Sequence, residues 1–303
     1  PGNGASELFL GILHALKPKK VILPVPSFYG YAYTAKAVGS EVVCVPLKKE
    51  EDFLPGEELV LALQEDAELL FLANPNNPTG ALYPKEVLQK IVDLAREHHL
   101  IIFSDEIYDR LVMDGKEHIS IASLAPDLFC VTFSGLSKSH MIAGFRIGWM
   151  VLSGNKAIAK DYIEGIKMLS NMRLCSNVPA QSIIQTALGG YQSVEEYLQP
   201  GGRIYEQREV IYKLLNDIPG VSAKKPKAAF YIFPKLDVEK FNIYDDEKFA
   251  LDLLREKRIL IVHGGGFNWG QPDHFRVVYL PRIADLEKAT KKLGEFLDGY
   301  HQK

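Results

Sequence analysis

Five short apolar segments recur along the first half of the chain, and they constrain its fold more than any other feature. They occupy residues 20–24, 40–47, 69–73, 100–103 and 128–133. Such runs are typical of strands that are buried on both faces. Stretches with a helical pattern alternate with them, at residues 7–16, 28–38, 57–64 and 84–99. This alternation predicts an α/β fold, in which a mostly parallel sheet is covered by helices on both faces.

A change in composition predicts a second, smaller domain. Glycine pairs at 189–190 and 201–202 follow an apolar strand at 147–152 and helices at 156–172 and 179–188. Beyond them, helices at 205–215, 246–256 and 283–297 mix with strands near 229–234, 259–262 and 274–279. We therefore expect a large domain over residues 1–190 and a small α+β C-terminal domain over residues 191–303.

The composition limits the class of function. Of the 303 residues 24% are charged, and the net charge of −3 offers no basic surface for nucleic acid. No apolar run approaches the ~20 residues that cross a bilayer, and no signal peptide is visible. Cys44, Cys130 and Cys175 suit a reducing compartment and form no metal cluster, so we expect a cytoplasmic protein without a metal. Because the chain starts at Pro1 within a Gly/Ser turn, we also expect that an N-terminal segment is missing.

Polar residues follow four of the expected strands at one edge of the sheet. These strand exits, the segments that directly follow a strand, are residues 24–28, 74–80, 105–108 and 134–138. Taken singly, Lys138 is typical of a solvated lysine, Asp105 of a helix N-cap, and Phe28 or Tyr108 of a core ring. Ligands of open α/β sheets, however, bind outside the carboxyl ends of the strands. The convergence of four such exits therefore predicts a binding site at this rim.

The residue types at this rim suit one cofactor. The turn at residues 2–6 opens a helix, whose free N–H groups favour a phosphate, although taken alone Ser6 is more typical of a plain N-cap. Arg146 follows Lys138 by eight residues and could bind the same anion. Pyridoxal phosphate requires a lysine amine for its aldehyde, an acid for its pyridine nitrogen and donors for its phosphate. The sequence therefore favours pyridoxal 5'-phosphate as the cofactor.

Three motifs carry a resemblance to a known family. They are Asn77-Pro78-Thr79-Gly80, the Ser-Asp-Glu-Ile-Tyr stretch at 104–108, and Gly135-Leu136-Ser137-Lys138 with Arg146 beyond it. In this order they resemble the class I/II aminotransferases, which have the aspartate aminotransferase fold (fold type I of the pyridoxal phosphate enzymes). The resemblance covers the whole chain. It implies an enzyme that exchanges an amino group between an amino acid and a 2-oxo acid.

The resemblance also implies a role for each matching residue. Lys138 would form the Schiff base and act as the catalytic residue, and Asp105 would pair with the pyridine nitrogen. Tyr108 and Asn77 would bond the ring hydroxyl, with Asn77 also reaching the substrate carboxylate. Phe28 would stack on the cofactor ring, and Arg276 would bind the substrate α-carboxylate in a bidentate manner. The residues implied for phosphate binding are Gly4, Ala5, Ser137 (or Ser134) and Arg146.

Longer stretches narrow the resemblance. Residues 162–169, 173–181, 186–192 and 272–276 resemble bacterial glutamate–pyruvate (alanine) aminotransferases. This implies L-alanine as amino donor, 2-oxoglutarate as acceptor, no nucleic-acid or membrane partner, and a homodimer with sites at the interface. The segment Ser139-His140-Met141 departs from the Thr-Tyr-Arg that usually follows the lysine in those relatives, which leaves the contacts around Lys138 open.

Two other functions stay open on the same fold. A C–S β-lyase would release pyruvate from cystathionine without a 2-oxo acid acceptor. A regulatory module would keep the cofactor fold without catalysis. Such modules usually carry an added DNA-binding domain, and no basic or helix-turn-helix segment is visible in this sequence. We therefore favour the transaminase.

Overall fold

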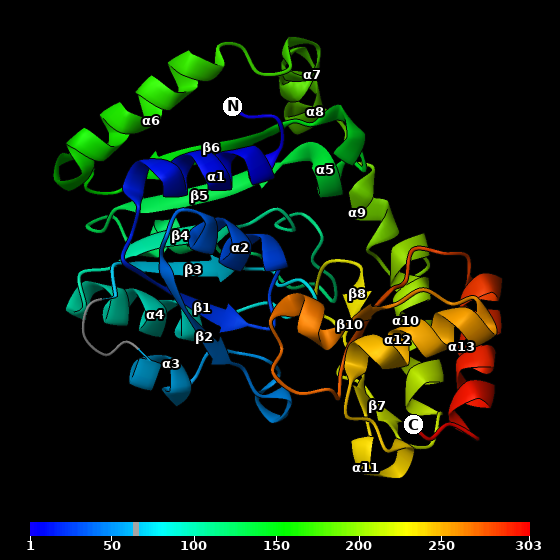
Figure 1. Ribbon diagram of the computed structural model, residues 1–303. Coiled ribbons are helices and arrows are strands. Elements are labelled where there is room, and N and C mark those ends of the chain that lie inside the picture. The colour runs from blue at the N-terminus through cyan, green and yellow to red at the C-terminus, as the bar shows by residue number, and fades with distance from the viewer. Residues whose placement is uncertain (63–66) are drawn as a thin grey trace.

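A six-stranded sheet forms the larger part of the computed structural model, which describes residues 1–62 and 67–303 (Figure 1). Its strands are β1 (Lys20–Val25), β2 (Glu41–Pro46), β3 (Leu69–Ala73), β4 (Ile101–Asp105), β5 (Cys130–Gly135) and β6 (Gly148–Ser153). They lie in the order β2-β1-β3-β4-β5-β6, and all neighbours are parallel except β5 and β6. The expected mostly parallel sheet is confirmed.

Helices cover both faces of this sheet. Those that precede residue 190 are α1 (Ala5–Leu16), α2 (Tyr29–Ala37), α3 (Glu57–Ala62), α4 (Lys85–Glu97), α5 (Leu136–Ser139), α6 (Lys160–Arg173), α7 (Val178–Ser182) and α8 (Ile184–Gly189), with 3-10 turns at Lys49–Glu51, Ile121–Leu124, Ala143–Phe145 and Lys156–Ala159. Residues of β3 alternate between two apolar cores. Leu69 and Phe71 pack on the side of α1 and α2, whereas Leu70 and Leu72 pack on the side of α3 and α4. This double burial explains why the strand is apolar throughout.

Several boundaries differ from the expected ones. β4 and β5 each end two residues later than predicted, so Asp105 is the last residue of β4 and does not lie beyond it. The reason is that the backbone ladder continues through polar side chains, since Ser104 pairs with Thr132 and Asp105 with Phe133. The helix expected at 57–64 is observed as α3, and its last residues lie outside the described part of the chain. The helix expected at 179–188 is divided into α7 and α8, and the one at 156–172 begins as a 3-10 turn.

The C-terminal part has the expected α+β character. Its helices are α9 (Val194–Tyr197), α10 (Arg203–Asn216), α11 (Val238–Phe241), α12 (Asp246–Lys257) and α13 (Ile283–Leu297), with a 3-10 turn at Gly264–Phe267. Its strands are β7 (Val221–Ser222), β8 (Tyr231–Ile232), β9 (Lys235–Leu236), β10 (Val262–His263) and β11 (Phe275–Val278), which form an antiparallel sheet β10-β11-β8 and a pair β7-β9. These yellow to red elements lie to the right of the large sheet in Figure 1. Among the helices of the described residues, none is both long and apolar enough to cross a bilayer.

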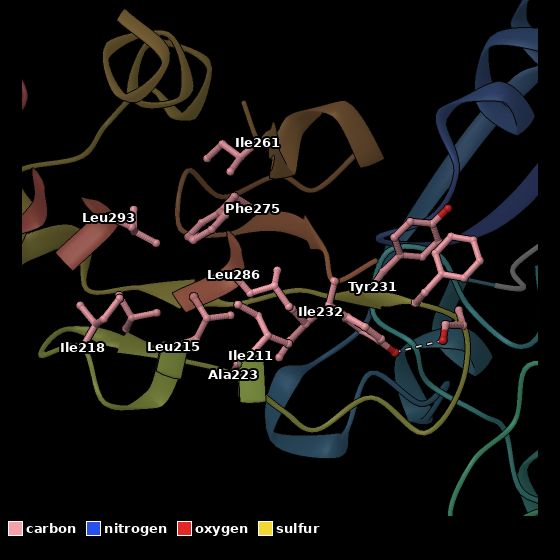
Figure 2. Close-up of a cluster of buried hydrophobic side chains, with 14 of the residues drawn as sticks. Ile211, Leu215, Ile218, Ala223, Tyr231, Ile232, Ile261, Phe275, Leu286 and Leu293 are labelled. Carbon is pink, nitrogen blue, oxygen red and sulfur yellow. Dashed lines mark hydrogen bonds between the residues drawn. The ribbon is translucent and has the colours of Figure 1, made fainter. Parts of the chain in front are cut away.

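One apolar cluster connects the two parts. Figure 2 shows its core, in which α10 and α13 pack against the three-stranded sheet through side chains that include Ile211, Leu215, Phe275, Leu286 and Leu293. Tyr231 lies at the end of the cluster that is far from Ile218. Tyr108 and Leu111, from the segment after β4, belong to the same cluster. The core of the C-terminal part therefore reaches the strand ends of the large sheet. The division of the chain at residue 190 stays a prediction.

Gly80 shows how closely the two parts approach. Its carbonyl accepts hydrogen bonds from the backbone N–H groups of Lys227 (2.9 Å) and Ala228 (3.0 Å). Its φ is +68°, and a Cβ at this position would lie 2.6 Å from the Pro226 Cβ. Only glycine fits both the left-handed backbone and this space. The loop that carries Asn77 is thereby held against the segment that leads into β8.

Candidate active site

Three parallel strands end side by side at the predicted rim. The backbone pairs Ala73 of β3 with Asp105 of β4, and Asp105 with Phe133 of β5. Three of the predicted site residues follow these ends within five residues, and they are Asn77, Tyr108 and Lys138. The topology therefore places all three at one edge of the sheet.

Lys138 lies in α5, which begins directly after β5. Its side chain is half-buried, and Nζ is 6.0 Å from the centre of the Phe230 ring. Its charge lies close enough to Asp105 to favour the ionised carboxylate. Ser137 precedes it in the same short helix and is also half-buried, while Ser134 is buried in β5. The lysine is thus held at the strand exit and not on a free loop.

Asp105 is a buried carboxylic acid, with a relative exposure of 5%. Its Oδ1 accepts a hydrogen bond from the Ile107 N–H at 3.1 Å, and its Oδ2 accepts one from the Tyr31 hydroxyl at 2.6 Å. Burial raises the pKa of Asp105 to about 6, although the two hydrogen bonds and Lys138 act in the opposite direction. A further cation beside this carboxyl would stabilise its ionised form.

Tyr31 bonds Asp105 in this candidate site, and the sequence predicted no specific role for it. Its ring is packed against Phe71 and Phe9, with ring centres 4.2 Å and 5.3 Å away. Burial and the neighbouring Asp105 raise the pKa of Tyr31 well above its ordinary value, so the hydroxyl stays a donor. Phe28 is half-buried beside it, at 5.4 Å between ring centres. The only signal in the sequence was the density of aromatic residues after the first strand.

The N-terminus of α1 lies against Arg146. Gly4 is its N-cap residue with φ of +83°, and no described side chain caps this helix end. Arg146 donates from Nη2 to the Asn3 carbonyl at 3.1 Å and from Nη1 to the Ala143 carbonyl at 2.8 Å. A Cβ at position 4 would collide with the guanidinium group. Gly4 and Ala5 therefore present an uncapped helix start beside an exposed cation, which suits an anion.

Arg276 of β11 reaches across from the C-terminal part to Asn77. Its Nη1 donates to Asn77 Oδ1 at 2.9 Å, although 199 residues separate the two in sequence. Its Nε is buried without a hydrogen-bond partner, and within the described residues no carboxylate forms an ion pair with its guanidinium. Burial lowers the pKa of Arg276 from its ordinary value. A half-buried guanidinium with an unpartnered donor and, among the described residues, no counter-ion suits an anion.

Tyr108 completes this group of residues. Its buried hydroxyl donates to the hydroxyl of Tyr231 at 3.1 Å. Burial, followed by the influence of Tyr231, raises the pKa of Tyr108 well above its ordinary value. The Arg276 guanidinium lies over the Tyr231 ring at 4.5 Å and over the Phe267 ring at 4.9 Å. Sequence reasoning did not find Tyr231 or Phe267, since nothing distinguishes them from ordinary core rings.

A family model described as "Aminotransferase class I and II" matches residues 1–293. The chain belongs to the class I and II aminotransferases. It is 50% identical to the glutamate-pyruvate aminotransferase AlaA of Escherichia coli K12, over 99% of this chain and 75% of that protein. It is 47% identical to the alanine aminotransferase of Mycobacterium bovis, over 99% of this chain and 71% of that protein. The chain thus spans about three quarters of the length of these relatives.

Solved structures confirm the aminotransferase fold. An aminotransferase from Escherichia coli superposes with a TM-score of 0.98 at 50% identity, over 100% of this chain and 76% of that chain. An alanine aminotransferase from Pyrococcus furiosus superposes with a TM-score of 0.92 at 37% identity, over 98% of this chain and 75% of that chain. The predicted family and fold are therefore correct.

The segment by which this aminotransferase departs from the resemblance forms its own contacts. His140 Nε2 lies 2.9 Å from the Ala187 carbonyl, and Nδ1 lies 2.9 Å from Ser139 Oγ. Because a carbonyl only accepts, Nε2 carries the proton and Nδ1 accepts from the Ser139 hydroxyl. Met141 is exposed. The residues after Lys138 are thus tied to α8, and they do not project from α5 as a free loop.

Proposed function

We propose that this aminotransferase transfers the amino group of L-alanine to 2-oxoglutarate and so forms pyruvate and glutamate. The single observation that carries the proposal is the half-buried guanidinium of Arg276, which has an unpartnered Nε donor and bonds Asn77 at the rim that also holds Lys138. Amino acids and 2-oxo acids share an α-carboxylate, and a guanidinium binds it in a bidentate manner. The names of relatives at 47–50% identity support alanine and glutamate–pyruvate as the substrate pair.

The residues present fit pyridoxal 5'-phosphate, which we propose as the cofactor. Asp105 is a buried acid that a positively charged pyridine nitrogen would stabilise. The uncapped start of α1 at Gly4 and Ala5 and the exposed Arg146 fit a phosphate. The remaining contacts in this proposal are Lys138 to the aldehyde carbon, Tyr108 and Asn77 to the ring hydroxyl, Phe28 to the ring face, and Ser137 to the phosphate.

The chemistry then divides among the residues of the site. Pyridoxal phosphate supplies, when bound, an electron sink for the charge that remains at Cα of the amino acid. Lys138 is the general base that takes the proton from Cα, because its amine is the positioned base at this rim. Arg276 and Asn77 hold the α-carboxylate, which fixes the substrate while the proton moves. Tyr31 and the Ile107 N–H keep the Asp105 carboxylate in place.

We also propose a homodimer whose interface includes the outer face of α6. This helix buries none of its residues in the single chain. Met168, Met172 and Leu174 are 62%, 80% and 76% exposed on or next to it. Water-exposed apolar side chains at this density favour a protein interface. Sites at that interface, a cytoplasmic location and the domain division at residue 190 stay predictions.

Absorption spectra of the cofactor-loaded protein test the proposed reaction. Mixing with alanine, valine, aspartate, glutamate or tyrosine should change the cofactor spectrum, and alanine and glutamate should react fastest. Lys138→Ala should bind cofactor without turning over. Pyruvate release from cystathionine in the absence of any 2-oxo acid would instead indicate a β-lyase. A spectrum that none of the five amino acids changes would rule out the transaminase.

A further inference from the structure

We propose that Tyr231 is a positioning residue with two separable tasks: its ring holds Arg276 for the substrate carboxylate, and its hydroxyl controls the direction of the Tyr108 proton. This inference rests on the proposed function, because it concerns how the same site meets its substrate and cofactor. Tyr231 belongs to β8 of the C-terminal part, whereas Tyr108 follows β4 of the large sheet. One side chain thus contacts both halves of the site.

The first task follows from the contacts of Arg276 with two rings. The guanidinium carbon lies 4.5 Å from the centre of the Tyr231 ring and 4.9 Å from that of Phe267. Both rings are buried, at 5% and 2% relative exposure. Asn77 bonds Nη1, and Nε stays without a partner. Two rings and one amide oxygen therefore hold the guanidinium, and among the described residues its Nε donor has no partner.

The second task follows from the single proton of a phenol. The Tyr108 hydroxyl donates to the Tyr231 hydroxyl at 3.1 Å. While this bond exists, the same proton is not fully available to an oxygen atom of a bound cofactor. Tyr231 therefore competes with the cofactor for the Tyr108 proton. Removal of the Tyr231 hydroxyl should therefore strengthen the hydrogen bond from Tyr108 to the ring oxygen of the cofactor.

Backbone contacts fix Tyr231 well enough for both tasks. Tyr231 of β8 pairs with Val278 of β11, the strand that also carries Arg276. The adjoining Ala229 N–H donates to the Leu111 carbonyl at 2.8 Å, which ties the segment to the chain after β4. Figure 2 shows the ring of Tyr231 at the border of the apolar cluster and not in its middle. The residue is anchored on one side and presents its ring and hydroxyl on the other.

Two single variants separate the tasks in the cofactor-loaded protein. Tyr231→Phe keeps the ring and removes the hydroxyl, whereas Phe267→Leu removes one stacking face and leaves Tyr108 untouched. Succinate, a carboxylate that cannot react, serves as the binding probe in calorimetry. The second measurement is the pH midpoint at which the visible absorption of bound pyridoxal phosphate changes. Tyr300→Phe removes a hydroxyl that bonds Asp252 at 3.0 Å, away from this group, and is the matched control.

For Tyr231→Phe we expect succinate affinity within about twofold of the parent. We expect the pH midpoint of the cofactor absorption to be lower by about 0.4 to 1 pH unit. The reason is that the Tyr108 hydroxyl becomes a stronger donor and stabilises the anionic ring oxygen by about one neutral hydrogen bond. For Phe267→Leu we expect affinity to fall about 3- to 10-fold through the lost cation–π contact, with the midpoint unchanged. Tyr300→Phe should change neither.

An unchanged or higher midpoint in Tyr231→Phe would overturn the inference, and so would a loss of succinate affinity as large as that of Phe267→Leu. Failure of the proposed function gives a different result. In that case the parent protein would bind no pyridoxal phosphate, or Arg276→Lys would bind succinate as tightly as the parent.

Discussion

Replacement of Asp105 by asparagine should stabilise the cofactor-free protein and weaken its binding of the cofactor. Burial raises the pKa of this carboxyl to about 6, about two units above its ordinary value. The native state therefore binds the proton more tightly than the unfolded chain, and stability falls as pH rises from about 4 to above 6. Two pKa units correspond to about 3 kcal/mol of folding stability, and this contribution is lost completely by pH 7.5. An asparagine side chain would keep the shape and an acceptor oxygen without the charge.

Thermal unfolding at several pH values measures this effect. At pH 7.5 the cofactor-free Asp105→Asn protein should unfold about 4 to 5 °C above the parent, which is the shift that about 3 kcal/mol gives for a chain of this length. At pH 4.5 the native carboxyl is largely protonated, but the unfolded one is already mostly ionised, so a difference of only about 1 kcal/mol, or about 1.6 °C, should remain. Saturating pyridoxal phosphate should narrow the difference at pH 7.5, because only the parent has a charge to pair with the ring nitrogen. The variant should bind cofactor about 10- to 100-fold more weakly, as expected for one charge-assisted hydrogen bond.

Two results would refute this reasoning. The first is a cofactor-free Asp105→Asn protein that is less stable than the parent at pH 7.5. The second is a difference in unfolding temperature that does not change between pH 4.5 and 7.5. Asp161→Asn, which alters an exposed carboxylate on α6, is the control and should shift unfolding by less than about 1 °C at both pH values.

Three further substitutions test other parts of the structure. Gly4→Ala should reduce cofactor affinity about tenfold in an absorbance titration, because the new Cβ displaces Arg146 and strains a backbone with φ of +83°; unchanged affinity would remove this turn from the phosphate site. Arg276→Lys should raise KM for alanine and for 2-oxoglutarate about 10- to 100-fold in steady-state kinetics, since lysine neither stacks nor forms two parallel bonds; a change for only one substrate would contradict a shared carboxylate site. Asp114→Ala should lower the unfolding temperature by about 3 °C, or about 2 kcal/mol, because it removes one of two carboxylates that pair with the fully buried Arg208; an unchanged unfolding temperature would show that Glu209 alone suffices.

The strands of the large sheet could be predicted because burial on both faces makes them apolar throughout. The run at 147–152 was equally apolar, yet β6 is antiparallel to β5. An apolar pattern carries no information about strand direction, which depends on the chain between the two strands. The end of β4 was predicted too early because Ser104 and Asp105 are polar. The backbone ladder continues through them, since it does not depend on side-chain polarity.

The candidate site could likewise be predicted only in part. The position of Asn77, Asp105 and Lys138 at one edge of the sheet could be predicted, because each lies close in sequence to a strand end. Arg276 on its own resembles a surface charge, and only the family resemblance gave it a role. Tyr31 and Tyr231 were missed because their hydroxyl partners are 74 and 123 residues away in sequence. A pattern of residue types cannot show which aromatic rings in a core meet a polar partner.

Asp105 and Arg276 are opposite in sign, and each lacks a full counter-charge. Asp105 has hydrogen-bond donors and the distant charge of Lys138, and Arg276 has only the neutral oxygen of Asn77 and two ring faces. Both groups therefore reduce the stability of the empty site. A ligand that is positive at the Asp105 end and negative at the Arg276 end removes both penalties together. A protonated cofactor ring beside a substrate carboxylate has this charge pattern, so the same burial that destabilises the empty site selects for the pair of molecules that transamination brings together.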